Sequence, residues 1–239
     1  MSSIAEAILH TKERIARACL DSGRDPHGVA LLAVSKTHPW AVVRQAVAAG
    51  QVAFGENYVQ EGLVKIGQAR LSHPLGGLQW HLIGPLQANK TRDVAEHFDW
   101  VHSVDRLKIA QRLSDQRPAG LAPLQVCLQV NISGQASKSG LAPEQALELA
   151  RQVQQLPRLQ LRGLMAIPEP AQSEQQRRAP YRALRELRDE MQRAEPGLRL
   201  DVLSMGMSDD LREAIAEGST LVRVGTAIFG RRQHGPAQP

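Results

Sequence analysis

The first apolar run of the chain, residues 30–35, ends directly before Lys36. Its length and composition predict a buried β-strand. Lysine is rare in strand interiors because an unpaired buried ammonium is costly in free energy. Two interpretations of Lys36 stay open at this point. Its side chain could extend to water, or its amine could be partly desolvated, have a lowered pKa and form a Schiff base with an aldehyde.

Two segments near the C-terminal end carry the glycines and hydroxyls that phosphate sites use. They read Leu203-Ser-Met-Gly-Met-Ser-Asp209 and Arg223-Val-Gly-Thr-Ala227. Their glycines allow a close backbone approach, the hydroxyls of Ser204 and Thr226 can donate hydrogen bonds, and a helix N-terminus near Ser208 would offer oriented amides. Each segment alone is equally typical of an ordinary turn, so only the two together indicate phosphate.

Arg223 lies within an apolar run and shares a strand face with Gly225. An arginine that faces inward needs an acceptor. That acceptor could be a carboxylate across the fold or the ring nitrogen of a ligand. Because arginine stays protonated, a pyridine nitrogen that faces it would stay unprotonated, which weakens the ring as an electron sink.

The elements that position these groups alternate between strand and helix along the whole chain. We expect an N-terminal helix over residues 1–20 and a long helix that begins at Pro180 and runs to residue 194. The remaining helices are expected at 39–49, 59–71, 87–97, 105–114, 143–155 and 208–217, and the strands at 30–35, 52–54, 78–83, 100–104, 124–130, 159–167, 200–203 and 221–224.

Eight strands alternating with helices in a chain of 239 residues predict an α/β fold, a (β/α)8 TIM-type barrel with an extra N-terminal helix. A doubly wound open sheet is the structural alternative, but no GxGxxG follows the first strand. No linker or composition shift divides the chain. We therefore expect residues 1–232 to form a single domain and residues 233–239 a disordered tail.

Composition excludes several function classes. The net charge is +5, but the arginines are scattered among glutamates and aromatic residues make up only 3% of the chain, which argues against nucleic acid binding. No apolar run approaches the ~18 residues of a membrane span, and the charged N-terminal helix does not read as a signal peptide. The two cysteines, Cys19 and Cys127, suggest neither a disulfide framework nor a metal site. We expect a cytoplasmic protein that binds no membrane.

Active sites of such barrels lie at the C-terminal ends of the strands, and phosphate is often bound after strands seven and eight. Lys36 follows the first predicted strand, and the two glycine-containing segments follow the seventh and eighth. A Schiff-base lysine, an arginine for a ring nitrogen and a phosphate site together match pyridoxal 5′-phosphate (PLP). The spacing therefore predicts a PLP site.

Nine short segments from the first to the eighth predicted strand support this interpretation. The chain closely resembles the pyridoxal phosphate homeostasis protein family, whose members are single-domain relatives of the barrel domain of alanine racemase. The matching segments are residues 33–36, 54–58, 81–90, 103–105, 130–133, 138–140, 163–168, 203–209 and 222–230.

The resemblance implies a covalent aldimine between PLP and Lys36. It also implies that Arg223 faces the pyridine nitrogen and that Asn57 contacts the ring side of the cofactor. The phosphate would be bound by Ser204, Gly225 and Thr226, and the pocket would be lined by Met205 and His81.

Three function classes are compared: a non-catalytic PLP carrier, a PLP-dependent amino-acid racemase, and a Schiff-base aldolase without PLP. A two-base racemase needs an acid/base group on each face of the cofactor. In alanine racemase the second base is a tyrosine from another domain and a partner subunit. This chain has only Tyr58, whose simpler role is packing, and Tyr181 on the long outer helix. We therefore expect a non-catalytic monomer for PLP homeostasis whose partners are PLP and apo PLP-dependent enzymes.

Overall fold

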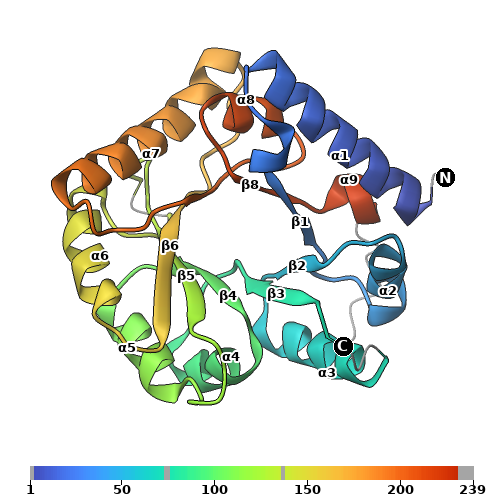
Figure 1. The fold of residues 1–239 in the computed structure, drawn as a ribbon. Helices are drawn as coiled ribbons and strands as arrows, with labels where there is room; N and C mark the ends of the chain where they lie inside the picture. Colours follow the sequence, from blue (N-terminus) through green and yellow to red (C-terminus); the bar gives the residue numbers. More distant parts are fainter. Residues whose placement is uncertain (1–2, 73–75, 136–137, 231–239) are drawn as a thin grey trace.

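Eight parallel strands form a closed barrel in chain order, with helices around it (Figure 1). The computed structural model describes residues 3–72, 76–135 and 138–230. The predicted TIM-type barrel with an extra N-terminal helix is confirmed. The strands are β1 (Ala30–Val34), β2 (Ala53–Glu56), β3 (Gln79–Leu82), β4 (Trp100–Val104), β5 (Leu124–Gln129), β6 (Leu159–Met165), β7 (Val202–Ser204) and β8 (Leu221–Val224).

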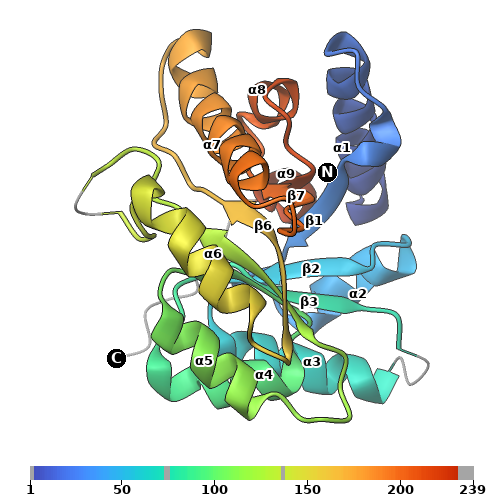
Figure 2. The same cartoon turned by 60° about the vertical axis from the view of Figure 1, so that its left-hand side comes forward.

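The helices form the outer layer. Figures 1 and 2 show α3, α4 and α5 on one side of the barrel and α1, α7 and α8 on the opposite side. The α-helices are α1 (Ile4–Asp21), α2 (Trp40–Ala48), α3 (Val59–Ser72), α4 (Thr91–His97), α5 (Leu107–Gln116), α6 (Ala146–Gln154), α7 (Glu174–Ala194), α8 (Leu211–Ala216) and α9 (Thr226–Phe229). Short 3-10 turns lie at Pro26–Gly28, Ala88–Lys90 and Pro143–Gln145.

The long helix α7 corrects the sequence-based boundary. It begins at Glu174 and contains Pro180 in its interior, whereas we expected it to begin at that proline. Its start is set by a capping box, in which Ser173 and Gln176 exchange side-chain and backbone hydrogen bonds. Proline is disfavoured inside helices, so the first-turn interpretation was the natural one and was wrong.

Element boundaries in the C-terminal part of the chain differ from expectation in smaller ways. β7 extends to Ser204, and the four-residue helix α9 directly after β8 was not expected. The expected tail, residues 233–239, lies outside the described residues, so the domain boundary stays a prediction. No helix in the described part of the chain is long and apolar enough to cross a membrane.

Two apolar clusters fill the molecule. The larger lies between the strands and the helices. The smaller lies inside the barrel and contains Leu32, Val34, Cys127, Val202 and Leu221. Because side chains alternate along a strand, Ser204 and Arg223 share the inward face with the last two of these residues. The carboxyl-terminal halves of β7 and β8 therefore place polar groups inside the barrel.

Gly163 offers a test of barrel closure. A methyl group at this position would lie 1.8 Å from the carbonyl oxygen of Val202 on the neighbouring strand. We expect Gly163→Ala to lower the free energy of unfolding by at least about 3 kcal/mol, since neither backbone can yield without breaking the ladder. The measurement is urea unfolding followed by circular dichroism.

The matched control is Gly67→Ala on α3, where an added methyl meets nothing within 4 Å. We expect the free energy of unfolding of this variant to rise by up to about 1 kcal/mol, because alanine is the better helix former. Equal stability of the two variants would contradict the packing at Gly163.

Candidate functional site

Lys36 lies two residues beyond β1, in a turn of unusual backbone geometry. Thr37 has a φ angle of +66°, which is uncommon for a residue with a β-branched side chain. The turn is fixed on both sides: the amide of Ser35 donates to the Gly55 carbonyl over 3.0 Å, and the amide of His38 donates to the Ser35 carbonyl over 3.1 Å. A strained turn that persists in this way is typical of functional sites.

A buried lysine supports this turn from below. Lys65 of α3 is 3% exposed, and its Nζ donates over 2.7 Å to each of three acceptors: the Ser35 carbonyl, Glu56 Oε1 and Glu61 Oε1. Glu61 also accepts from the amide of Thr37. The residues that flank the candidate Schiff-base lysine are therefore held by one ion cluster, which the sequence reading missed.

Glu56 is the buried acid of this cluster. Its Oε1 accepts from the Ser35 hydroxyl and from Lys65, whereas its Oε2 has no hydrogen-bond partner among the described residues. Burial raises the pKa of Glu56, and the neighbouring Lys65 ammonium acts in the opposite direction. Because Lys65 lies 2.7 Å away, we assign the pair as carboxylate and ammonium.

Arg223 brings a permanent positive charge into the barrel. Its NH1 donates to the carbonyl and to the hydroxyl of Ser204, and its NH2 donates over 2.8 Å to the Ala166 carbonyl. Burial lowers the pKa of Arg223, but arginine starts so high that the guanidinium stays charged. Its hydrogen-bond partners among the described residues are neutral oxygens, so the carboxylate weighed from sequence is not its acceptor, and the ring nitrogen of a ligand stays a prediction.

Two histidines extend the hydrogen-bond chain that starts at this arginine and passes through Ser204. His102 Nδ1 lies 2.8 Å from the Ser204 hydroxyl, and His102 Nε2 lies 3.0 Å from His81 Nδ1. The serine hydroxyl accepts from Arg223, and His102 Nδ1 is the acceptor within reach of its own proton, so we assign the hydroxyl as the donor to His102. Each imidazole then carries its proton on Nε2, and the chain ends at the buried Nε2 of His81, which has no partner among the described residues.

Burial keeps both imidazoles neutral. It lowers the pKa of His81 to about 3. Burial also lowers the pKa of His102, with further contributions from His81 and Arg223. His81 stacks on Trp100 with 5.2 Å between ring centroids, so its place is the barrel core beneath the strand ends.

The structure brings some of the predicted residues together and separates others. The β1–β8 register places Leu32 opposite Arg223, and a methyl group on Gly225 would lie 3.0 Å from the Val34 carbonyl. The turn that carries Lys36 therefore adjoins Gly225 and the exposed Thr226. Ser204 lies lower, fully buried, with its hydroxyl on His102 and Arg223.

Two further predicted residues have distinct surroundings. Met205 is fully buried and packs in the outer apolar cluster between strands and helices, so its side chain does not join the group inside the barrel. Asn57 is half-buried just beyond β2, and its Oδ1 is a buried acceptor without a partner among the described residues. Gly84 lies so close that a methyl group there would be 2.2 Å from the Asn57 carbonyl, which fixes this backbone.

The arrangement suits a ligand with a carbonyl group and an anionic group. It offers an amine beyond β1, a charged guanidinium in β8, an unpartnered amide oxygen beyond β2 and a glycine turn before α9. The first amides of a helix have no acceptor within it, so the start of α9 adds donors. No cluster of metal-ligating side chains occurs within the ranges that the structure describes. These residues fit PLP, whose aldehyde, ring nitrogen and phosphate need such partners.

Comparison with known proteins decides the family. The family model for the alanine racemase N-terminal domain matches residues 7–233. The pyridoxal phosphate homeostasis protein of Pseudomonas aeruginosa is 61% identical over 98% of both chains, and that of Vibrio cholerae is 53% identical over 98% of both chains. The chain belongs to the pyridoxal phosphate homeostasis protein family. The resemblance drawn from sequence motifs is thereby confirmed.

A solved structure similar to this chain supports the fold of the site. PipY of Synechococcus elongatus PCC7942, solved with PLP bound, is 40% identical and superposes with a TM-score of 0.81 over 95% of this chain and all of that chain. PipY and this chain therefore share the barrel in which the residues above lie.

The Lys65 cluster generates a stability prediction. We expect Lys65→Met to lower the free energy of unfolding by about 3–5 kcal/mol, because the buried Glu56 carboxylate loses its charged partner. Urea unfolding at pH 7 measures the loss. The double variant Lys65→Met with Glu56→Gln removes the uncompensated charge, so we expect it to recover part of the lost stability. If Lys65→Met alone were as stable as the unmodified protein, the ion cluster would be contradicted.

The buried histidines generate a pH prediction. The folded-state pKa of His81, about 3, lies below the ordinary value of 6.5, so the unfolded chain binds a proton that the folded chain does not. Stability is therefore full above pH 6.5 and is lost as the pH falls toward 3, by about 2 kcal/mol at pH 5 for this residue.

Urea unfolding between pH 7 and pH 5 checks this slope. We expect His81→Gln to flatten it, with a remaining slope from His102. His10→Gln, at an exposed site on α1, is the control and should leave the slope unchanged. An identical slope in His81→Gln and the unmodified protein would rule out a neutral buried His81.

Proposed function

We propose that this chain binds PLP at the C-terminal ends of its strands and serves PLP homeostasis in the cytoplasm. The observation that carries the proposal is the adjacency of the Lys36 turn to Gly225, two residues beyond Arg223, across the β1–β8 pair. The names of the relatives and the PLP-bound structure of PipY support the same ligand. The recipients we propose are apo PLP-dependent enzymes, and the protein acts as a monomer.

Lys36 is the proposed covalent anchor. Its amine would hold PLP at the barrel mouth through a Schiff base with the aldehyde, formed with the loss of water. The ion cluster of Lys65 keeps the turn in place while the side chain of Lys36 reaches the ligand. Asn57, with its unpartnered oxygen, is proposed to contact the ring side.

The phosphate is proposed to lie between the turns that follow β7 and β8. Gly225 permits a close approach beside the Val34 carbonyl, and Thr226 presents an exposed hydroxyl at the start of α9. The hydroxyl of Ser204 would have to leave His102 or Arg223 to join them. His81 is proposed to line the pocket by packing, whereas Met205, whose side chain packs in the outer apolar cluster, is proposed to support only the backbone after β7.

We infer a carrier rather than a catalyst. Arg223 stays charged, so it favours an unprotonated ring nitrogen and disfavours the electron withdrawal that carbanion chemistry needs. Tyr58 is 62% exposed, and the hydroxyl of Tyr181 donates a hydrogen bond to Asp210. A racemase-like enzyme is the alternative, since the barrel matches the alanine racemase N-terminal domain.

Lysine replacement tests the anchor. We expect the protein with PLP to show a visible aldimine band that is absent in Lys36→Ala, because that variant lacks the attacking amine. The exposed Lys108→Ala is the control and should retain the band. If the unmodified protein stayed colourless after PLP was added, both the carrier and the racemase-like function would be excluded. A Schiff-base aldolase would then remain.

Isotope exchange separates carrier from racemase. We expect no deuterium to enter the α-position of added alanine in heavy water, since the charged Arg223 leaves the ring a weak electron sink. Proton NMR follows the exchange over hours. Fast incorporation that requires Lys36 would establish the racemase-like alternative.

A further inference from the structure

The β7–α8 loop, residues 205–210, contains one of the two turns proposed to receive the phosphate. Its first part is fixed by close packing: Gly206 has a φ angle of +93°, and a methyl group there would lie 2.5 Å from the Ala214 side chain. The Gly206 carbonyl also accepts from the Arg223 amide over 2.9 Å. Neither contact reaches the second half of the loop.

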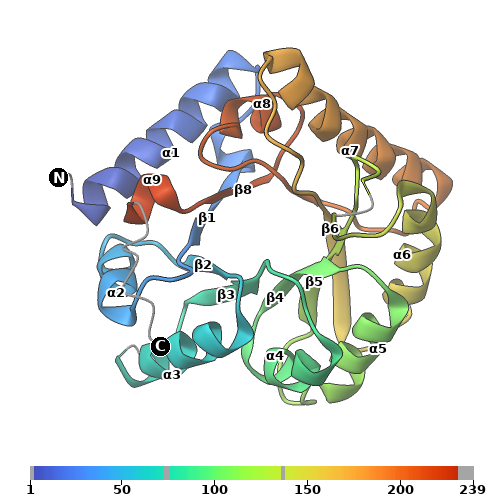
Figure 3. The same cartoon turned by 180° about the vertical axis from the view of Figure 1, so that it is seen from behind.

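The second half is fixed by polar contacts from the outer helices. Figures 1 and 3 show α8 between α1 and α7. From α1, Arg14 NH2 donates over 2.8 Å to the Ser208 carbonyl. From within the loop, the Met207 amide donates over 2.6 Å to Asp210 Oδ1. Asp210 is therefore the side chain that shapes this half.

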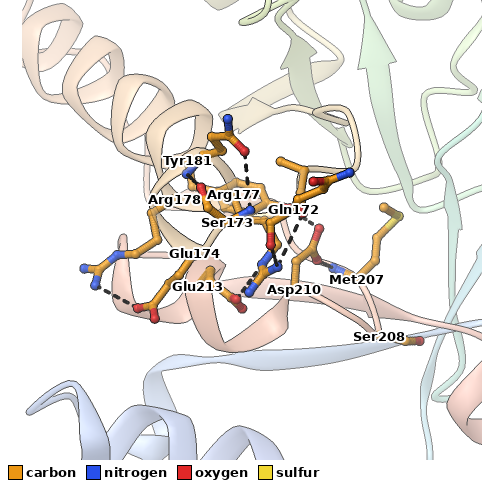
Figure 4. Close-up of polar contacts among 12 residues, drawn as sticks. Gln172, Ser173, Glu174, Arg177, Arg178, Tyr181, Met207, Ser208, Asp210 and Glu213 are labelled. Atoms are coloured by element: carbon orange, nitrogen blue, oxygen red, sulfur yellow. Dashed lines mark hydrogen bonds and ion pairs between the residues drawn. The ribbon is translucent and has the colours of Figure 1, made fainter.

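Asp210 is in turn held by α7. The hydroxyl of Tyr181 donates to Asp210 Oδ2 over 2.7 Å, so one donor binds each carboxylate oxygen (Figure 4). Tyr181 is only 1% exposed, so its hydroxyl cannot turn to water. Burial, and next the Asp210 carboxylate, raise the pKa of Tyr181, which keeps the phenol protonated and donating.

The packing around Asp210 does not hold its carboxylate when the hydrogen bond from Tyr181 is lost. A cavity of about 180 Å³ lies beside it, with Pro168, Tyr181, Met207 and Asp210 among its lining residues. The carboxylate therefore has room to rotate once the hydroxyl is gone. A rotated carboxylate would release the Met207 amide and could bring a negative charge toward the phosphate, which like charges oppose.

We propose that Tyr181 is a positioning residue for phosphate binding, acting through Asp210 to hold residues 205–210 in the conformation that receives the phosphate of PLP. This inference rests on the proposed function. The sequence placed Tyr181 on an outer helix with no part in the site; its contact with Asp210 gives it one.

The neighbouring Arg177 shows why Tyr181 is the cleaner target. Arg177 Nε donates to Glu213 of α8 over 2.7 Å, and its NH1 donates to the Ala171 and Gln172 carbonyls (Figure 4). Its replacement would loosen α7, α8 and the preceding loop together. Tyr181→Phe removes one hydroxyl and keeps the buried ring.

The test compares PLP with pyridoxal, which has the aldehyde and the ring but no phosphate. Dissociation constants come from titration of the aldimine band. For Tyr181→Phe we expect affinity for PLP to fall about tenfold and affinity for pyridoxal to stay unchanged, as loss of one bond to a charged group implies. Thr91→Val, which removes a buried hydroxyl on α4, is the control and should keep both constants.

A double-mutant cycle completes the test. Asp210→Ala should reproduce the selective loss, and the double variant should lose no more, because the two side chains act in one chain of contacts. Additive losses, or equal losses for PLP and pyridoxal, would overturn the role of Tyr181. If the unmodified protein bound pyridoxal as tightly as PLP, the phosphate site of the proposed function would itself be wrong, whatever the variants did.

Discussion

The buried guanidinium of Arg223 is the constraint to which most of the site responds. A permanent charge inside a barrel must be surrounded by acceptors, and here the Ser204 and Ala166 carbonyls and the Ser204 hydroxyl supply them. We assign that hydroxyl as the donor to His102, and this assignment places the proton of each buried histidine on Nε2. One charged side chain in β8 thus begins a chain of polar contacts that crosses the barrel.

A second buried charge governs the other half of the site. The Lys65 ammonium binds the Ser35 carbonyl and two carboxylates, and Glu61 binds the Thr37 amide. The turn that carries Lys36 is therefore held from below by charge-assisted bonds, which are stronger than neutral ones. Rigid support of the backbone around Lys36 suits a protein that retains an aldehyde, because the turn keeps its position when the ligand binds.

Much of this could be predicted from the sequence, for identifiable reasons. Alternating apolar runs indicated the barrel, and the strand-end rule for such barrels singled out Lys36, Arg223 and Gly225 without any coordinates. What failed depended on tertiary contacts. Pro180 predicts a helix start, but the capping box that begins α7 lies seven residues upstream, at Ser173. Ser204 predicts only a phosphate contact, since its hydrogen bonds with His102 and Arg223 join three separate strands and leave no local pattern.

Other residues carried no signal that the sequence could have revealed. Lys65 looks like any helix lysine, yet it is 3% exposed. Tyr181 lies in a strongly charged helix, and only the fold shows that its hydroxyl reaches Asp210. Both act on the loops that follow strands rather than on a ligand directly. Positioning residues of this kind depend on packing between distant segments, and a single sequence does not encode that in any local pattern.

We propose that Lys36, among the six lysines of the chain, is the one that holds PLP. Borohydride reduction of the protein loaded with PLP, followed by peptide mapping of the reduced adduct, tests it most directly. We expect one equivalent of phosphopyridoxyl group on the peptide that contains Lys36. A principal adduct on any other lysine, or no adduct at all, would contradict it.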